Sequence, residues 1–216
     1  RGSRAAHPRA GQREGSRVTE RRKREVILAE SAGFCFGVQK AVETVYREAE
    51  ESKDTVYSYG AIIHNEEVVR DLTEKGVVVF EDEDAAAKVR ALPEEAGTII
   101  LRSHGVGPEV YRLCEEKKLR IVDTACPFVN KIHRIVQTEN RKGRRVLIVG
   151  DPKHPEVEGI RAWGRADTAV IRDEEEFLAL QIPKDVPLSV VAQTTFRLPK
   201  FKMLVDKIRE LGYDIA

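Results

Sequence analysis

The sequence has little cysteine and no pair of the CxxC type. Its three cysteines, Cys35, Cys114 and Cys126, are spread over a chain of 216 residues. A small disulfide-stabilised domain carries an even, closely spaced set of cysteines, and a zinc ribbon carries CxxC pairs. The cysteines therefore indicate neither a disulfide framework nor a structural zinc site.

Long apolar runs are also absent from the sequence. No stretch approaches the roughly 18 uninterrupted apolar residues that a membrane-spanning helix requires. No apolar run follows the basic start of the chain, as it would in a signal peptide. Hydrophobic residues still make up 41% of the chain, which is enough to form a core. We therefore expect a cytoplasmic globular protein without a membrane partner.

A strong charge of one sign is missing from the chain as a whole, whose formal net charge is +1. Residues 1–24 nevertheless hold nine Lys or Arg against Glu14 and Glu20, so the remainder is about six charges negative. An acidic charge on the residues after 24 does not suit a nucleic-acid enzyme, because affinity for nucleic acid depends on positive side chains that neutralise phosphates. Residues 1–24 also contain Gly, Ser and Pro without a hydrophobic period, which predicts a disordered basic leader.

After the leader, short β-branched runs alternate with amphipathic runs, the pattern of parallel βαβ units. We predict an α/β fold of two successive αβ domains, residues 25–126 and 127–216, with mainly parallel sheets flanked by helices. Strands are expected at 26–30, 55–59, 77–80, 98–102, 120–123, 146–150, 169–172 and 188–192.

Helices are expected between these strands, at 38–51, 66–75, 108–117, 127–141, 156–163, 174–180 and 199–211. Asn65 precedes two glutamates and predicts a helix N-cap with acidic residues in the first turn. Gly76, Gly143 and Gly212 stand where helices should end.

Side chains suited to catalysis or ligand binding fall just after predicted strands, where parallel sheets gather their ligand-binding loops. They are Cys35, His64, His104, Cys126, His154, Glu156 and the run Gln193-Thr194-Thr195. Each alone has an ordinary explanation, because a cysteine at a strand end is often a small buried hydrophobe and a histidine before Gly or Pro is often a loop residue. Their joint placement favours one shared cleft.

Three further residues are excluded from the expected site. His133 lies in the middle of a predicted helix, where we expect a surface or hydrogen-bonded side chain. His7 belongs to the leader, and Cys114 falls in a helical stretch and is expected in the core.

The expected site favours an anion and a metal cluster. Three imidazoles, together with backbone amides at helix starts, suit a diphosphate. Thiolates from separate loops suit a cluster held between domains better than a zinc knuckle. Glu156, close to His154, is suited to donate or relay a proton.

Six motifs stand in a fixed order along the chain: AGFCFGV around Cys35, IIHN at His64, SHGV at His104, DTACPFV at Cys126, HPEVEG from His154 and AQTT ending at Thr195. In this order they resemble the 4-hydroxy-3-methylbut-2-enyl diphosphate reductase family, the LytB-type iron–sulfur reductases. The resemblance runs from about residue 26 to the C-terminus.

The resemblance implies an iron–sulfur oxidoreductase that acts on an allylic diphosphate. Its reaction removes the allylic hydroxyl reductively and yields isopentenyl and dimethylallyl diphosphate, the last step of the methylerythritol phosphate pathway of isoprenoid biosynthesis. Electrons would come from ferredoxin or flavodoxin through a [4Fe-4S] cluster.

The same resemblance gives each site residue a role. Cys35 and Cys126 match two of three cluster ligands, and Glu156 matches the proton donor. Thr194 matches a residue close to the substrate hydroxyl. The diphosphate ligands are matched by His64, His104 and His154.

The family fold implied by the resemblance is a trefoil-like arrangement of three αβ domains. The third domain, with the third cluster cysteine and Ser and Asn contacts to the diphosphate, is expected to be missing from this sequence. The strand at 26–30 is expected to pair with that third domain. We therefore expect little or no activity from the present chain alone.

Two other functions remain open from the residues. A non-redox diphosphate-binding α/β module would keep the histidines and bind no iron. A metal-dependent hydrolase would place His, Cys and Glu on zinc, although the sequence contains no HExxH motif. Iron and sulfide content separates these alternatives from the reductase.

Overall fold

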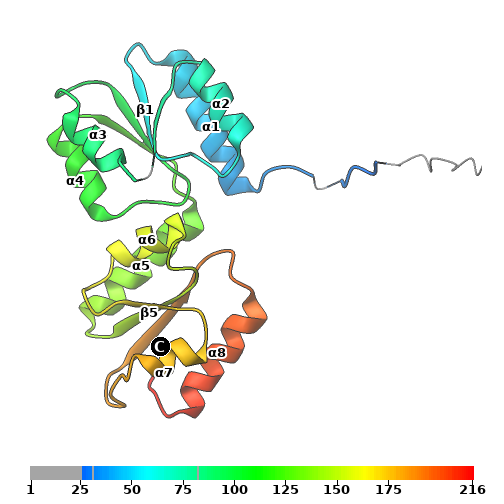
Figure 1. The fold of residues 1–216 in the computed structure, drawn as a ribbon, viewed down its shortest axis with the longest axis vertical. Helices are drawn as coiled ribbons and strands as arrows, with labels where there is room; N and C mark the ends of the chain where they lie inside the picture. Colours follow the sequence, from blue (N-terminus) through cyan, green and yellow to red (C-terminus); the bar gives the residue numbers. More distant parts are fainter. Residues whose placement is uncertain (1–25, 31, 82) are drawn as a thin grey trace, which may run out of the picture. The chain divides into compact units, whose positions relative to one another are not determined.

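The computed structural model describes residues 26–30, 32–81 and 83–216, and it divides the chain into two units, residues 1–33 and 34–216. The predicted leader, residues 1–24, lies outside the described residues, as does His7. Residues 34–216 hold all the helices and strands described below (Figure 1).

The strand predicted over residues 26–30 is wrong. These residues form no strand, and Val26, Ile27 and Leu28 are 91, 83 and 82% exposed. The two sheets of the described residues are built from other segments. A strand needs a neighbour for its peptide N–H and C=O groups, so the apolar composition of this segment does not by itself make it a strand.

The first sheet consists of four parallel strands in the order β2-β1-β3-β4. They are β1 (Val56–Tyr59), β2 (Val78–Phe80), β3 (Thr98–Leu101) and β4 (Arg120–Asp123). Tyr59 pairs with Leu101, and Leu101 pairs with Asp123, so three strands end in register. The loops that carry His64, His104 and Cys126 therefore leave the sheet at one edge.

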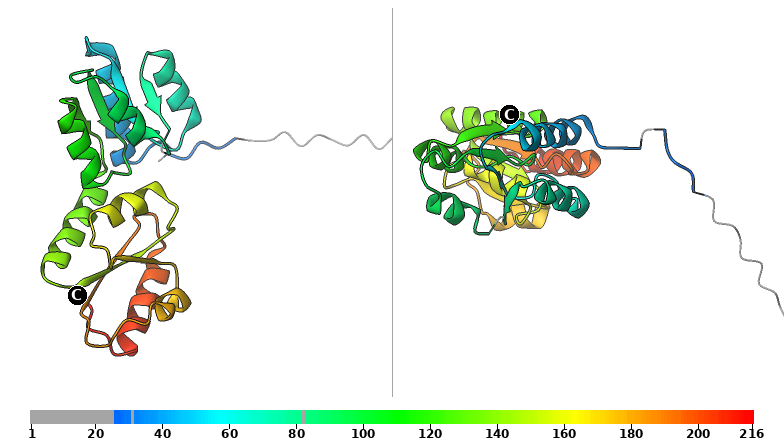
Figure 2. Two further views of the ribbon diagram at one scale, coloured as in Figure 1. Left: turned by 60° about the vertical axis from the view of Figure 1, so that its left-hand side comes forward. Right: turned by 90° about the horizontal axis from the view of Figure 1, so that it is seen from above.

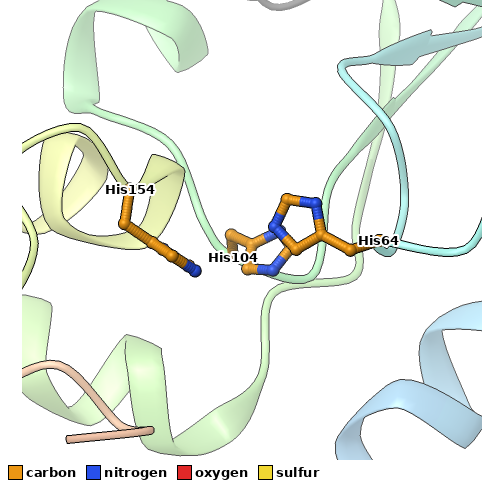
Figure 3. Close-up of side chains that lie close together, drawn as sticks. All are labelled: His64, His104 and His154. Atoms are coloured by element: carbon orange, nitrogen blue, oxygen red, sulfur yellow. The ribbon is translucent and has the colours of Figure 1, made fainter.

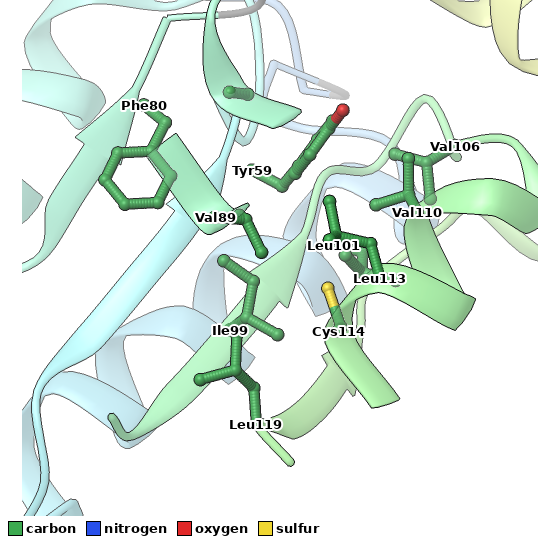
Figure 4. Packing of buried hydrophobic residues seen from close by; sticks show 11 residues of the cluster. Tyr59, Phe80, Val89, Ile99, Leu101, Val106, Val110, Leu113, Cys114 and Leu119 are labelled. Carbon is green, nitrogen blue, oxygen red and sulfur yellow. The ribbon is translucent and has the colours of Figure 1, made fainter. Parts of the chain in front are cut away.

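Helices cover both faces of this sheet (Figure 1). On one face, α1 (Phe36–Glu51) and α2 (Glu66–Glu74) form a core with Ile100 of β3. On the other face, α3 (Ala85–Ala91) and α4 (Pro108–Glu116) pack on Ile99 and Leu101 of the same strand (Figure 4). Neighbouring residues of β3 thus point to opposite faces, and its fully buried TIIL sequence reflects burial on both sides.

The second sheet has three parallel strands in the order β6-β5-β7. They are β5 (Arg145–Val149), β6 (Ala169–Ile171) and β7 (Leu188–Ala192). Each face of this sheet has its own core, and alternate residues of β5 belong to the two cores. On one face, Val146 and Ile148 pack with α5 (Pro127–Arg141) and α6 (Pro155–Ala162). On the other face, Leu147 and Val149 pack with α7 (Glu174–Ala179) and α8 (Leu198–Glu210). Figure 2 shows this layering from two further directions.

The predicted α/β class with parallel sheets is confirmed, and the seven other strands lie within one residue of their expected bounds. Asn65 caps α2 as predicted, because its side chain accepts a hydrogen bond from the Val68 amide at 3.0 Å. Gly76, Gly143 and Gly212 follow the helix ends with φ angles of +91°, +82° and +87°. Helix α3 was not predicted, because its AAAKVRA sequence is too short to show a helical period.

The predicted domain boundary lies at Cys126 and Pro127, between β4 of the first sheet and β5 of the second, and it stays a prediction. None of the helices among the described residues has the length and apolar character needed to cross a membrane.

Candidate active site

His64, His104 and His154 form a histidine cluster (Figure 3). His64 lies in the loop after β1, His104 in the loop after β3, and His154 directly before α6, beyond β5. Their ring centroids are 4.5 Å (His64 to His104), 5.5 Å (His104 to His154) and 5.6 Å (His64 to His154) apart. One ring nitrogen of each lies within 4.8 Å of those of the others. Two sheets thus contribute side chains to a single site.

Ser103 links three of the loops that build this site. Its hydroxyl donates a hydrogen bond to the Ile62 carbonyl at 2.7 Å, and its amide donates to the same oxygen at 3.3 Å. The Ser103 carbonyl accepts from the Cys126 amide at 2.9 Å. Ser103 is almost fully buried, so these bonds hold the His64, His104 and Cys126 loops together without competition from water.

The helix that His154 begins determines which of its ring nitrogens carries the proton. Its Nδ1 atom accepts a hydrogen bond from the Glu156 amide at 3.1 Å and so acts as the N-cap of α6. A neutral imidazole with an accepting Nδ1 carries its proton on Nε2. The tip of the ring points toward His104 and His64 (Figure 3). His154 therefore presents an N–H donor to the cluster, which suits an anion and does not suit a metal ion.

The charge around His104 also favours an anion. The pKa of His104 is lowered to about 4, first by burial and then by repulsion from His64, His154 and Arg102. At neutral pH its imidazole is therefore uncharged in the free protein. A negatively charged ligand would oppose the repulsion and raise the pKa of this group.

Glu156 is joined to Thr194 by two hydrogen bonds. The Thr194 amide donates to Oε1 at 2.6 Å, and the Thr194 hydroxyl donates to Oε2 at 2.7 Å. Glu156 is only 2% exposed, in the first turn of α6, while Thr194 follows β7. Both carboxylate oxygens are therefore held in place, two residues along the chain from His154.

Cys35 and Cys126 occupy equivalent positions at helix starts. Cys35 is the N-cap of α1 and Cys126 the N-cap of α5, and neither side chain makes a capping hydrogen bond. Both are free thiols, Cys35 exposed and Cys126 partly buried. A helix N-terminus favours a nearby negative charge. The two sulfurs thus fit the role of thiolate ligands to iron.

Gly37 brings the start of α1 next to Cys126. A Cβ atom on Gly37 would lie 2.8 Å from Cys126 Sγ, closer than real Cβ atoms approach other atoms. Glycine therefore lets the cysteine-bearing segments meet. Neither cysteine belongs to the histidine cluster, which is the one group of at least three close metal-ligating side chains among the described residues.

The profile of the family described as LytB protein matches residues 26–216. The chain belongs to the LytB protein family.

Several LytB relatives share the same described activity. The protein named 4-hydroxy-3-methylbut-2-enyl diphosphate reductase in Alkaliphilus oremlandii is 39% identical over 193 residues, which are 88% of this chain and 65% of that protein. The protein of the same name in Geobacter metallireducens is 41% identical over 192 residues, which are 88% of this chain and 64% of that protein. The LytB chain thus spans about 65% of the length of the curated relatives it matches.

Two solved structures resemble this LytB chain. One is described as (E)-4-hydroxy-3-methyl-but-2-enyl diphosphate reductase, the terminal enzyme of the non-mevalonate pathway. It has a TM-score of 0.72 and 33% identity, with 88% of this chain and 66% of that chain covered. The other, the E-1-hydroxy-2-methyl-but-2-enyl-4-diphosphate reductase of Plasmodium falciparum, has a TM-score of 0.76 and 27% identity, with 87 and 57% covered.

The prediction for His133 is wrong. We expected a surface or hydrogen-bonded side chain, but His133 of the LytB chain is 4% exposed, and its Nε2 has no partner among the described residues. Burial lowers its pKa to about 4, against an opposing effect of the Asp123 charge. The ring is held by stacking on Trp163 at 5.5 Å between centroids. Cys114 is fully buried, as predicted.

Two structural residues of the site were not assigned roles from the sequence. Gln193 accepts from the Asp151 amide at 3.1 Å and donates to the Thr195 hydroxyl at 3.0 Å, and so connects the loops after β5 and β7. Ser103 ties three loops as described above. Both lie inside the quoted motifs AQTT and SHGV, but the Asp151 amide and the Ile62 carbonyl that they bind are 42 and 41 residues away, and no local pattern indicates these bonds.

Proposed function

We propose that this LytB chain carries the diphosphate-binding site, the proton donor and two cluster ligands of a 4-hydroxy-3-methylbut-2-enyl diphosphate reductase. The reaction removes the allylic hydroxyl of the substrate reductively and gives isopentenyl and dimethylallyl diphosphate. The observation that carries the proposal is the histidine cluster, with an N–H donor of His154 directed into it next to a buried Glu156.

The histidine cluster would hold the diphosphate of the substrate. His154 donates from Nε2 while Nδ1 caps α6. His104 is neutral when the site is empty, because burial and then repulsion lower its pKa to about 4, and attraction to the bound anion would raise that pKa. The N–H donors of the histidine rings would then surround the phosphate oxygens, and hydrogen bonds to this charged group would fix the substrate in place.

Glu156 and Thr194 would deliver the proton that the departing hydroxyl needs. When Glu156 is protonated on Oε2, its O–H donates to Thr194 Oγ1, so the hydroxyl proton of Thr194 is free to point toward the substrate. The Thr194 amide still donates to Oε1, and the pair keeps its geometry while the proton moves. A short relay of this kind would let the hydroxyl leave as water, which is a better leaving group than hydroxide.

Cys35 and Cys126 would hold a [4Fe-4S] cluster, as their positions at two helix starts and the Gly37 contact support. When bound, such a cluster would supply electrons and Lewis acidity. We expect ferredoxin or flavodoxin as the electron donor and a cytoplasmic location. Each cysteine would place a cluster-binding thiolate at a helix N-terminus, where the helix dipole favours negative charge.

Anaerobic reconstitution with iron and sulfide tests the cluster proposal. Wild type should bind both and gain visible absorption, and Cys35→Ala and Cys126→Ala should lose most of each. Cys114→Ala is the matched control, since Cys114 is buried in the core and outside the site. Equal iron and sulfide in all four proteins would contradict the assignment. Diphosphate binding without iron in wild type would instead favour the non-redox module.

A further inference from the structure

The loop that carries His104 touches the helix that begins with His154. Gly159 lies in α6, and a Cβ atom there would lie 3.2 Å from the Gly105 carbonyl oxygen and 3.6 Å from the Val106 amide nitrogen. No side chain separates the two segments at this point. The backbone of α6 therefore rests directly on the peptide that follows His104.

Trp163 adds a directed bond at the end of the same helix. Its indole Nε1 donates to the Val106 carbonyl at 2.9 Å. The ring stacks on His133 and lies 6.1 Å from the ring of Tyr111, between centroids. These aromatic neighbours limit the rotation of the indole, so the N–H group stays aimed at the loop.

Helix α5 holds the opposite side of the loop. A Cβ on Gly105 would lie 2.6 Å from His133 Cε1 and 3.1 Å from Val129 Cγ1, and Gly105 has a φ angle of +73°. Gly105 is therefore packed between α5 and α6. A shift of α6 relative to this loop would move His154 and Glu156 relative to His104.

We propose that Gly159 and Trp163 are positioning residues, which fix α6 against the His104 loop and thereby set the separation of His154 and Glu156 from His104. For its ligand, this inference rests on the proposed diphosphate function. Neither residue is a member of the histidine cluster, and both act through the backbone of residues 105 and 106. Their effect should therefore appear in ligand affinity and in ring-to-ring distances, beyond any effect on stability.

Gly159→Ala and Trp163→Phe test the proposal. The alanine methyl should push α6 away by a few tenths of an ångström, and phenylalanine keeps an aromatic ring but loses the N–H donor. Gly164→Ala is the control, because the atoms nearest to its methyl would belong to Thr168 in the loop after α6. All are made in the full chain, and thermal unfolding reports the stability of each.

Two measurements read the position of the histidines. Nuclear Overhauser effects between the ring protons of His104 and His154, in protein labelled at histidine, need no ligand; they should weaken in Gly159→Ala and Trp163→Phe and persist in Gly164→Ala. The dissociation constant for inorganic diphosphate should rise about tenfold in the first two variants, the loss expected when one hydrogen bond to a charged group is lengthened.

The outcomes separate this inference from the proposed function. Unchanged ring contacts in Gly159→Ala and Trp163→Phe, or effects that Gly164→Ala reproduces at equal loss of stability, would overturn the positioning role. Absence of diphosphate binding in wild type would overturn the proposed ligand, while the ring contacts would still decide whether the two residues set the geometry.

Discussion

His154 combines two tasks in one side chain, because one ring nitrogen caps α6 and the other faces the histidine cluster. The capping task requires an unprotonated Nδ1, and the binding task requires a proton on Nε2. The two requirements agree for the neutral ring. They would conflict if Nε2 bound a metal ion. Nε2 would then carry no proton, and Nδ1 could accept the hydrogen bond only if the ring had no N–H at all.

Substitution of His154 separates these tasks. Asparagine is a good N-cap, so His154→Asn should retain stability and lose about tenfold in affinity for inorganic diphosphate. His154→Ala should lose that affinity and also about 1 kcal/mol of unfolding free energy. Calorimetric titration and urea unfolding measure the two quantities. Wild-type affinity in His154→Asn would show that the ring is not a ligand.

His133 shows a second consequence of burial at the residue scale. Its pKa in the folded protein, about 4, is below the ordinary value of 6.5, so folding disfavours its protonated form. The contribution of this group to the free energy of unfolding is complete above pH 6.5. It is lost as the pH falls toward 4, because protonation of His133 favours the unfolded chain. His104, shifted in the same direction, adds to this loss.

Replacement of His133 by phenylalanine should reduce this sensitivity to acid. His133→Phe keeps a flat ring against Trp163 and removes a buried nitrogen without a partner among the described residues. Urea unfolding between pH 7 and 4.5 should show equal or higher stability at pH 7 and a shallower decline below pH 6.5 than in wild type. Parallel curves for the two proteins would contradict the effect.

At the scale of elements, the sequence predicts where strands end better than which segments meet. The fully apolar run of β3 and the caps at Asn65 and Gly76 are local signals, and they place His64 and His104 correctly at the ends of neighbouring strands. The contact of Gly159 with Gly105 joins residues 54 positions apart and leaves no period in the sequence. The segment 26–30 shows the opposite case, an apolar run without a partner strand.

The start of α1 provides a test at this scale. Gly37→Ala should favour the helix by its intrinsic propensity but force Cys126 Sγ to move, since the new methyl would lie 2.8 Å away. We expect the reconstituted iron and sulfide content to fall severalfold. Gln39→Ala, on an exposed position of the same helix, should leave it unchanged. Full cluster loading of Gly37→Ala would show that the close approach is dispensable.

For the whole molecule, the site depends on both sheets. His64 and His104 follow strands of the first sheet, while His154, Glu156 and Thr194 lie in segments that follow strands of the second. The sequence places all five at strand ends, but only the packing of the two sheets brings the histidine rings within contact distance. The family and the α/β class were both predictable from the sequence motifs and strand pattern, and the distances between side chains were not.

A calorimetric titration of the full chain with inorganic diphosphate, in two buffers of different ionisation heat, tests the histidine cluster most directly as the diphosphate site. Binding should be accompanied by net proton uptake, because the anion raises the pKa of His104, and should be about tenfold weaker in His64→Ala. Gln39→Ala, at an exposed position of α1, should bind as wild type does. Absence of diphosphate binding, or binding that His64→Ala leaves unchanged, would contradict the assignment of the histidine cluster as the diphosphate site.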